Sequence, residues 1–162
     1  MPATYEPIAT TTLGSAGNLT FTSIPSTYTD LILVGAGTAT STGDIRVRFN
    51  NDSGSNYSNT VLLGEASTAR SARSTSATAS IIGFYWFGLQ SDQAHWIINI
   101  QNYANTTTYK TALARSNNKP KETDAIVALW RSTAAIDRID LFVNGSTFAS
   151  GTTFSLYGIK AA

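Results

Sequence analysis

The chain has 162 residues, no cysteine and a formal net charge of +1, with only 13% of its residues charged. This length fits one domain with a sizeable core, and the absence of cysteine excludes disulfides and thiolate metal sites. The near-neutral charge gives no indication of nucleic acid or an anionic membrane surface as a partner. No apolar run approaches the roughly eighteen residues of a membrane span, and the start MPATYEPIATTT lacks the basic and apolar segments of a signal peptide.

Ser, Thr, Asn and Gly are abundant and Lys, Glu and Leu are few, a mixture that disfavours helices and suits strands and turns. Short apolar runs separated by turn residues recur at close spacing, as is typical of a sandwich or a barrel. We predict about ten strands and no significant helix. In chain order the apolar runs cover residues 8–12, 19–24, 29–37, 45–50, 60–64, 81–89, 95–103, 109–115, 124–131, 137–144 and 154–159.

The alternation inside these runs predicts which side chains face the core, because successive residues of a strand point to opposite faces of its sheet. In IRVRFN the apolar residues alternate with Arg46 and Arg48, which therefore face outward. The predicted inward residues of two runs are Ile45, Val47 and Phe49, and then Ile139, Leu141 and Val143.

The last run, residues 154–159, also alternates and places Phe154, Leu156 and Gly158 on one face. We expect it to be a strand that closes the sheet beside the N-terminal strand, because the first and last strands of a jelly roll lie side by side. The predicted fold is therefore a single antiparallel β-sandwich over residues 1–162, with a jelly roll as its expected form.

The segment EASTARSARSTSATAS, residues 65–80, is the one stretch whose composition allows a helix. It has no apolar stripe that would hold a helix against a core. We interpret it as a long polar surface excursion.

The acidic residues and the single histidine lack the pattern of an active site. The acids are scattered, mostly at turns, whereas hydrolysis by paired carboxylates needs two acids face to face. His95 cannot form a multi-histidine metal centre and no GxSxG turn accompanies it, so we interpret it as a half-buried, hydrogen-bonded strand residue. The loop NNDSGSN, residues 50–56, lacks the acidic spacing of a calcium loop. We predict no enzyme activity, no metal and no cofactor.

The run IIGFYWFGL is apolar on both faces of its predicted strand. One face of a sandwich strand points away from the core, so its side chains need another cover. The alternatives are a flanking loop of the same chain, a neighbouring subunit or a sugar ligand, and a subunit interface fits a wholly apolar run best. The predicted interface residues are Ile81, Tyr85, Phe87 and Leu89.

Two pairs of arginines are candidates for docking on a partner, because arginine favours recognition of carboxylates across interfaces. One pair stands on the outer face of its strand and the other lies in the polar segment 65–80; solvated surface charges are the alternative. The predicted docking residues are Arg46, Arg48, Arg70 and Arg73.

Four segments, TYEPIATTTLGS, FTSIPSTYTDLILVG, RFNNDSGSNYSNTVLLG and FASGTTFSLYGIK, resemble virion proteins of tailed bacteriophages, cyanophages especially. These small β-sandwich proteins are described as capsid decoration (cement) proteins or as tail-fibre and receptor-binding modules. The resemblance covers about residues 4–64 and 137–160. It implies a jelly-roll-like sandwich, no catalysis and frequent homotrimers, and it assigns no site residue.

A tail-fibre module is normally the head of a longer chain with a repetitive stem, whereas the predicted sandwich here takes up essentially the whole polypeptide, without heptads or collagen-like repeats. We therefore expect a capsid decoration protein on the exterior of the virion. Its homotrimers would bind the major capsid protein and stabilise the shell through many modest contacts. The alternative is a tail-fibre module that recognises a host surface glycan, and a glycoside hydrolase is a more distant third.

Overall fold

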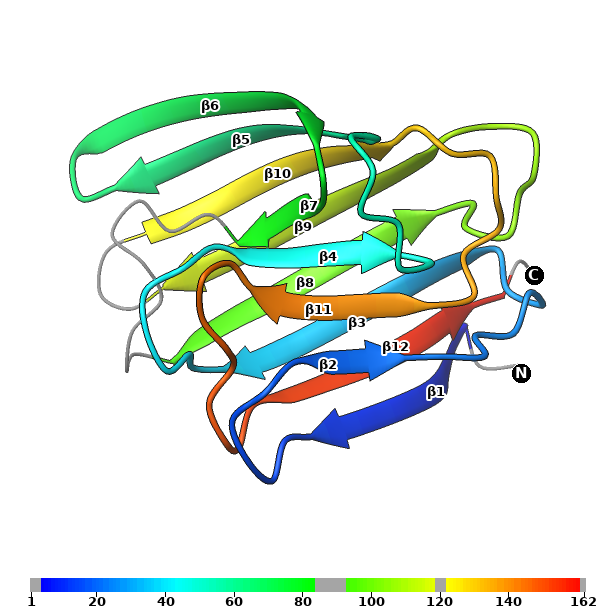
Figure 1. Cartoon of the computed structure of the whole chain (residues 1–162), viewed down its shortest axis with the longest axis horizontal. Helices are drawn as coiled ribbons and strands as arrows, with labels where there is room; N and C mark the ends of the chain where they lie inside the picture. Colours follow the sequence, from blue (N-terminus) through cyan, green and yellow to red (C-terminus); the bar gives the residue numbers. More distant parts are fainter. Residues whose placement is uncertain (1–3, 84–92, 119–121, 161–162) are drawn as a thin grey trace.

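The computed structural model describes residues 4–83, 93–118 and 122–160, which form twelve β-strands in two antiparallel sheets packed face to face (Figure 1). The predicted all-β sandwich is confirmed, in a jelly-roll-like form. The described residues contain no helix, and hence none able to cross a membrane. The eight-stranded sheet has the order β1 (Tyr5–Thr12), β12 (Thr153–Ile159), β3 (Asp30–Gly37), β8 (Ala94–Gln101), β9 (Lys110–Asn118), β10 (Glu122–Trp130), β5 (Tyr57–Glu65), β6 (Thr68–Ala77), and the four-stranded sheet has the order β2 (Leu19–Phe21), β11 (Ile139–Val143), β4 (Ile45–Phe49), β7 (Ser80–Gly83).

The last strand closes the large sheet, as the sequence predicts. β12 pairs with β1 on one side and with β3 on the other. The Thr10 and Ser155 hydroxyls lie 2.9 Å apart across the β1–β12 pair, while Phe154 and Leu156 are fully buried on the opposite face of β12. The final run is therefore an interior strand of the sheet.

The core lies between the sheets and consists of the inward residues of the alternating strands. The two predicted inward sets, one in β4 and one in β11, are all buried. Aromatic rings concentrate at two places, one around the stacked pair Tyr57 and Trp130, with ring centroids 6.3 Å apart, and one around the stacked pair Trp96 and Phe154, with centroids 5.5 Å apart. Such ring pairs add to the burial term that holds the sheets together.

The structure of residues 65–80 differs from the predicted irregular surface excursion. Most of this segment forms β6, an edge strand that pairs with β5 through a hairpin whose turn includes Ala66 at a positive φ of 50°. The segment needs no apolar stripe, because the ladder to β5 satisfies its backbone on one side and its Ser, Thr and Arg side chains stay in solvent. Residues 65–78 are therefore polar and largely exposed but regular, whereas Ala79 and Ser80 at the end of the segment are buried.

The loop 50–56 has a structural role that its composition does not reveal. The Asp52 carboxylate accepts hydrogen bonds from the Gly54 amide at 2.8 Å, from Asn56 at 2.9 Å and from the Trp130 indole at 2.7 Å. Burial alone would raise the pKa of this carboxyl, but these hydrogen bonds outweigh it and hold the pKa below its ordinary value. The loop is thus fastened to a core aromatic of β10.

Candidate binding face on the eight-stranded sheet

The outer face of the eight-stranded sheet is built from alternate residues of its strands, whose remaining residues fill the core. The strand register places these outward residues in rows that cross the sheet. One row consists of Val34, Ile97, Arg115, Ala125 and Leu62, and the row beside it consists of Ile32, Asn99, Leu113, Val127, Thr60 and Arg73.

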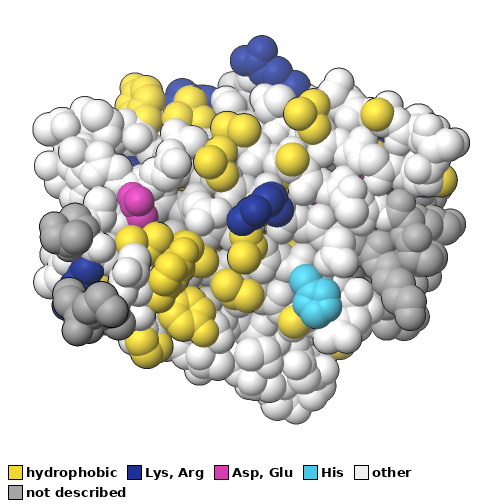
Figure 2. Space-filling model, turned by 180° about the vertical axis from the view of Figure 1, so that it is seen from behind, with side chains coloured by type: hydrophobic (Ala, Val, Ile, Leu, Met, Phe, Trp, Pro, Cys, Tyr) yellow, Lys and Arg dark blue, Asp and Glu magenta, His cyan; other side chains and the backbone are white. Residues whose placement is uncertain are grey.

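Several aliphatic side chains on this face are exposed. Leu62 is 58% exposed, Val127 is 48% exposed, and Leu113 and Val34 are 38% exposed each. Leu113 and Val127 are direct cross-strand partners, and Leu62 belongs to the adjacent row. Hydrophobic side chains gather next to a basic side chain near the middle of this face (Figure 2). Contiguous exposed apolar surface of this kind is typical of binding sites.

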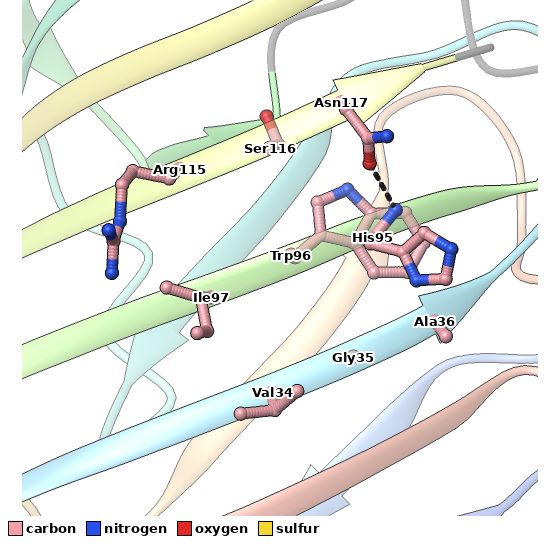
Figure 3. A pocket seen from close by; sticks show the side chains of 9 residues that line it. All are labelled: Val34, Gly35, Ala36, His95, Trp96, Ile97, Arg115, Ser116 and Asn117. Atoms are coloured by element: carbon pink, nitrogen blue, oxygen red, sulfur yellow. Dashed lines mark hydrogen bonds between the residues drawn. The ribbon is translucent and has the colours of Figure 1, made fainter.

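Two shallow hollows lie in this face, and Arg115 lines both of them. The first, of about 390 Å³, has walls that include Leu62 and Val127 and a small residue, Ala125, between them. The second, of about 330 Å³, extends along β8 and β9 past His95 (Figure 3). Ala125 is the register partner of both Leu62 and Arg115, so its short side chain leaves the depression between two longer ones.

The second hollow has a polar end. The Asn117 side-chain oxygen accepts a hydrogen bond from the His95 backbone amide at 3.0 Å, which fixes the orientation of the Asn117 amide (Figure 3). His95 itself is exposed, which corrects the expectation of a half-buried histidine, because it points outward from β8 while Trp96 points into the core.

The charge on this face is one-sided. By strand alternation, Asp30 at the end of β3 is the only acidic residue among the described strand residues that point outward from this sheet. Arg115 and Arg73 point outward in neighbouring rows, and within the described part of the chain neither side chain makes a hydrogen bond, an ion pair or a ring contact.

The outer face of the four-stranded sheet differs, because its charges are engaged with one another. Arg46 pairs with Asp44 at 3.1 Å, and Arg138 pairs with Asp140 at 2.7 Å. The Arg48 guanidinium lies 4.7 Å from the centroid of the Phe142 ring and its Nε donates to the Thr78 carbonyl at 3.0 Å. This face therefore offers fewer unengaged groups to a partner.

The four predicted docking arginines do not form one group. Arg46 and Arg48 face outward on the four-stranded sheet, as their alternation predicts, whereas Arg70 and Arg73 lie on opposite faces of β6. Arg70 forms an ion pair with Glu65 at 3.7 Å. Because the outer faces of the two sheets point in opposite directions, Arg46 and Arg48 cannot contact the same flat partner surface as Arg73, which corrects the grouping.

The predicted subunit interface is described only at its start. Ile81 is 8% exposed and belongs to the buried core cluster, and its backbone amide donates to the Asn59 side-chain oxygen at 2.9 Å. This corrects the expectation that Ile81 stands on an uncovered face. Tyr85, Phe87 and Leu89 lie outside the described residues, so their place in an interface remains a prediction.

Across residues 4–83, 93–118 and 122–160, no three His, Cys, Asp or Glu side chains come together in a way that could hold a metal ion. The oxygen-rich loop 50–56 directs its one carboxylate, that of Asp52, at Gly54, Asn56 and Trp130.

The residues that define this face were missed at the sequence level, although part of the signal was present. In YKTALAR the alternation sets Leu113 and Arg115 on the face opposite two alanines, and in DAIVALWR it sets Val127 on the face opposite Ile126. The sequence does not show that β9, β10 and β5 are neighbours, which is what brings these residues together.

Neither a protein-family model nor a curated protein matches this chain. Among solved structures, it is similar to an alginate lyase from Aplysia kurodai with 10% identity and a TM-score of 0.32, over 84% of this chain and 70% of that one. An alginate lyase in complex with an alginate tetrasaccharide has 8% identity and a TM-score of 0.30, over 94% and 79% of the two chains. Lactose-liganded congerin II has 10% identity and a TM-score of 0.30, over 76% and 98%. Likenesses this weak carry no argument about function.

Proposed function

We propose that this chain is a non-enzymatic structural protein of a phage virion, a capsid decoration protein. In this proposal it binds the major capsid protein on the capsid exterior as an oligomer, with the homotrimer as the expected form, and it stabilises the shell. The sequence resemblance over residues 4–64 and 137–160 supports the class of protein. The apolar outer face of the eight-stranded sheet supports a docking role.

That face is the single observation on which the docking role rests. The described part of the chain leaves four aliphatic side chains of this face exposed: Leu62, Val127, Leu113 and Val34. Fully burying a Leu or Val side chain is worth about 1.5–3 kcal/mol. These side chains are already partly covered by their neighbours, so a partner would gain roughly 1 kcal/mol from each. A modest gain of this kind suits a protein added to a shell in many copies, because multivalent attachment multiplies weak contacts.

The test is the position and the number of copies on the particle. Purified virions should contain the protein in a number comparable to that of the major capsid protein, measured by quantitative gel or mass spectrometry. An image reconstruction should place it on the outside of the shell, and the mass of the free protein in solution should give the oligomeric state. A few copies confined to the tail would contradict the decoration role.

A second candidate function is recognition of a host surface glycan. The observation that favours it is the polar end of the second hollow, where His95, Asn117 and Arg115 supply hydrogen-bonding groups beside an apolar floor. Sites of this mixed kind are typical of small-ligand recognition. A glycan array probed with the oligomer would support this function if one carbohydrate class bound and if the Asn117→Ala variant lost that binding.

A further inference from the structure

We infer that the outer face of the eight-stranded sheet binds a protein surface that presents a carboxylate among aliphatic side chains, with Arg115 as the anchor of that carboxylate. This inference rests on the proposed function, since it describes the chemistry of the shell surface on which the protein would dock. It replaces the predicted docking arginines Arg46, Arg48 and Arg70 as the principal charged contacts.

Most arginine side chains of the described residues are already engaged within the chain. Arg46, Arg70 and Arg138 are held in ion pairs with Asp44, Glu65 and Asp140, respectively. Two further arginines are also engaged: Arg48 by the Thr78 carbonyl and the Phe142 ring, and Arg131 by the Ser55 carbonyl at 2.7 Å.

In contrast, Arg115 and Arg73 are without such contacts in the described part of the chain, and both point outward from the eight-stranded sheet. A guanidinium held on a rigid strand, with its donors unengaged, is suited to bidentate recognition of a carboxylate.

Arg115 lies between two apolar register partners and beside two hollows. Its register partners are Ile97 on one side and Ala125 on the other, and it lines both hollows. A carboxylate at Arg115 would therefore be flanked by two depressions, of about 390 and 330 Å³, each with room for an apolar side chain. The aliphatic groups around them would exclude water from the ion pair, which strengthens it.

A second copy of the same face does not fit as the occupant. A symmetric face-to-face dimer would bring Arg115 and Arg73 of both copies into one interface. The described outward strand residues of this sheet supply only Asp30, at its margin, to balance them. Like charges opposed in a partly dry interface cost free energy, so the complementary partner carries the acid itself.

The lining of the hollows suits a protein better than a sugar. Sugar-binding platforms stack rings on exposed aromatic side chains, whereas the aromatic residue at these hollows, Trp96, is 1% exposed and stacks on Phe154 in the core. The exposed lining of the first hollow is mainly aliphatic, with Leu62 and Val127 as its most open members. Packing of aliphatic side chains into aliphatic hollows is typical of the core of protein–protein interfaces.

The first experiment needs no shell. The blocked peptide acetyl-Val-Leu-Glu-Leu-Val-amide is titrated into isotopically labelled protein, and backbone amide shifts are followed by NMR, with the Gln version of the peptide as the matched probe. We expect shifts that are clustered on β9, β10 and β5, larger for the Glu peptide than for the Gln peptide, and lost in Arg115→Gln. The absence of shifts on this face, equal shifts from the two peptides, or larger shifts from an oligouronate would overturn the inference.

The second experiment uses shells stripped of the protein. The wild type, Arg115→Glu and the matched reversal on the opposite face, Arg48→Glu, are first shown by thermal unfolding to be folded, and their binding to the shells is then measured. We expect Arg115→Glu to bind about tenfold or more weakly than the wild type and Arg48→Glu to bind within about twofold of it. If the wild type binds the shells and the Arg115→Glu variant binds them equally well, the inference is overturned while the proposed function stands. If the wild type fails to bind any shell, the proposed function fails, and the peptide titration still decides the chemistry of the face.

Discussion

The ammonium group of Lys160 lies 2.8 Å from the Oε1 atom of Glu6, so the residue that follows the last strand is tied to the first strand. Tyr28 adds a contact at the same place, because its hydroxyl donates to Oε2 of Glu6 at 3.3 Å. The hydrogen bond from Lys160 lowers the pKa of Glu6, and the same bond raises the pKa of Lys160. This exposed pair marks the place where the sheet closes, while the closure itself depends on β12.

Truncating the chain after Thr152 should therefore prevent folding. The truncation removes Phe154 and Leu156 from the core and leaves β1 and β3 without the strand between them. Loss of two fully buried large side chains costs roughly 5 kcal/mol or more, which is comparable to the whole stability of a small domain. We expect an insoluble product or one without a cooperative thermal transition.

The matched control ends at Ile159 and removes Lys160, with its ion pair to Glu6 and its backbone hydrogen bond to the Thr4 carbonyl, together with the two residues after it. Because exposed ion pairs contribute little, this variant and Glu6→Gln should keep a cooperative transition close to that of the wild type. A soluble, cooperatively unfolding chain that ends at Thr152 would contradict the role of β12.

Gly35→Ala should destabilise the protein although the added group is one methyl. Gly35 lies on β3 directly under the ring of Phe154, and a Cβ at this position would overlap the ring. Overpacking of this kind typically costs 1–3 kcal/mol. The matched control is Gly64→Ala in the same sheet, where the nearest atom to the new Cβ is the Thr123 hydroxyl at 3.6 Å.

Urea denaturation of the two glycine variants provides the measurement. The penalty at Gly35 should shrink when Phe154 is replaced by Leu, because the two positions are in contact and the coupling is then visible in a double-mutant cycle. Equal stabilities for Gly35→Ala and Gly64→Ala would show that the ring can move aside without cost.

Asp52→Asn should weaken the protein at neutral pH and matter less in acid. Burial raises the pKa of Asp52, but the hydrogen bonds from Trp130, Asn56 and Gly54 outweigh it and hold the folded-state pKa below its ordinary value. A carboxyl with a lowered folded-state pKa stabilises the fold at pH values above its unfolded-state pKa, near 4, and this stabilisation is lost as pH falls through the folded value. Hydrogen bonds to a charged group are worth about 1.5–3 kcal/mol, so we expect a deficit of roughly 2 kcal/mol at pH 7.

Chemical denaturation at pH 7 and near pH 3 tests this sign. The difference in unfolding free energy between the wild type and Asp52→Asn should narrow on acidification. Glu6 and Asp140 also have lowered pKa values, but they titrate in both proteins and cancel in the difference. A difference that is constant with pH would mean that the Asp52 charge has no part in holding the loop.

The local patterns of the sequence predict the sheets well, for a physical reason. Strands with one buried face must alternate, so the inward set Ile45, Val47 and Phe49 follows directly from the order of residues. The closing strand is predictable on the same ground, since Phe154 and Leu156 alternate with polar residues. The polar segment 65–80 was harder, because an edge strand is held by backbone pairing and its side chains carry no periodic signal.

The binding face could not be derived in the same way. Arg115 has Ile97 and Ala125 as register partners, and Ala125 has Leu62, because the large sheet has the order β8–β9–β10–β5, which places β5 beside β10 although the two strands are far apart in the chain. Neighbours of this kind are fixed by long-range pairing and leave no trace in the spacing of residues. Arg46 and Arg48 lie on a different sheet from Arg73, and this could not be predicted for the same reason. The sheet to which a strand belongs is set by the topology of the whole chain.

Replacing Leu62 and Val127 together by Thr should separate docking from stability. Both side chains are largely in solvent in the free protein, and Thr is well accepted in strands, so the unfolding free energy should change by less than about 1 kcal/mol. Shell binding should nevertheless weaken about tenfold or more per site, because two apolar contacts of roughly 1 kcal/mol each are removed. The matched control is Phe142→Thr on the outer face of the four-stranded sheet, which should leave shell binding unchanged. If the Thr pair binds shells as the wild type does while Phe142→Thr does not, the docking surface is the four-stranded sheet, and the assignment of the eight-stranded face is wrong.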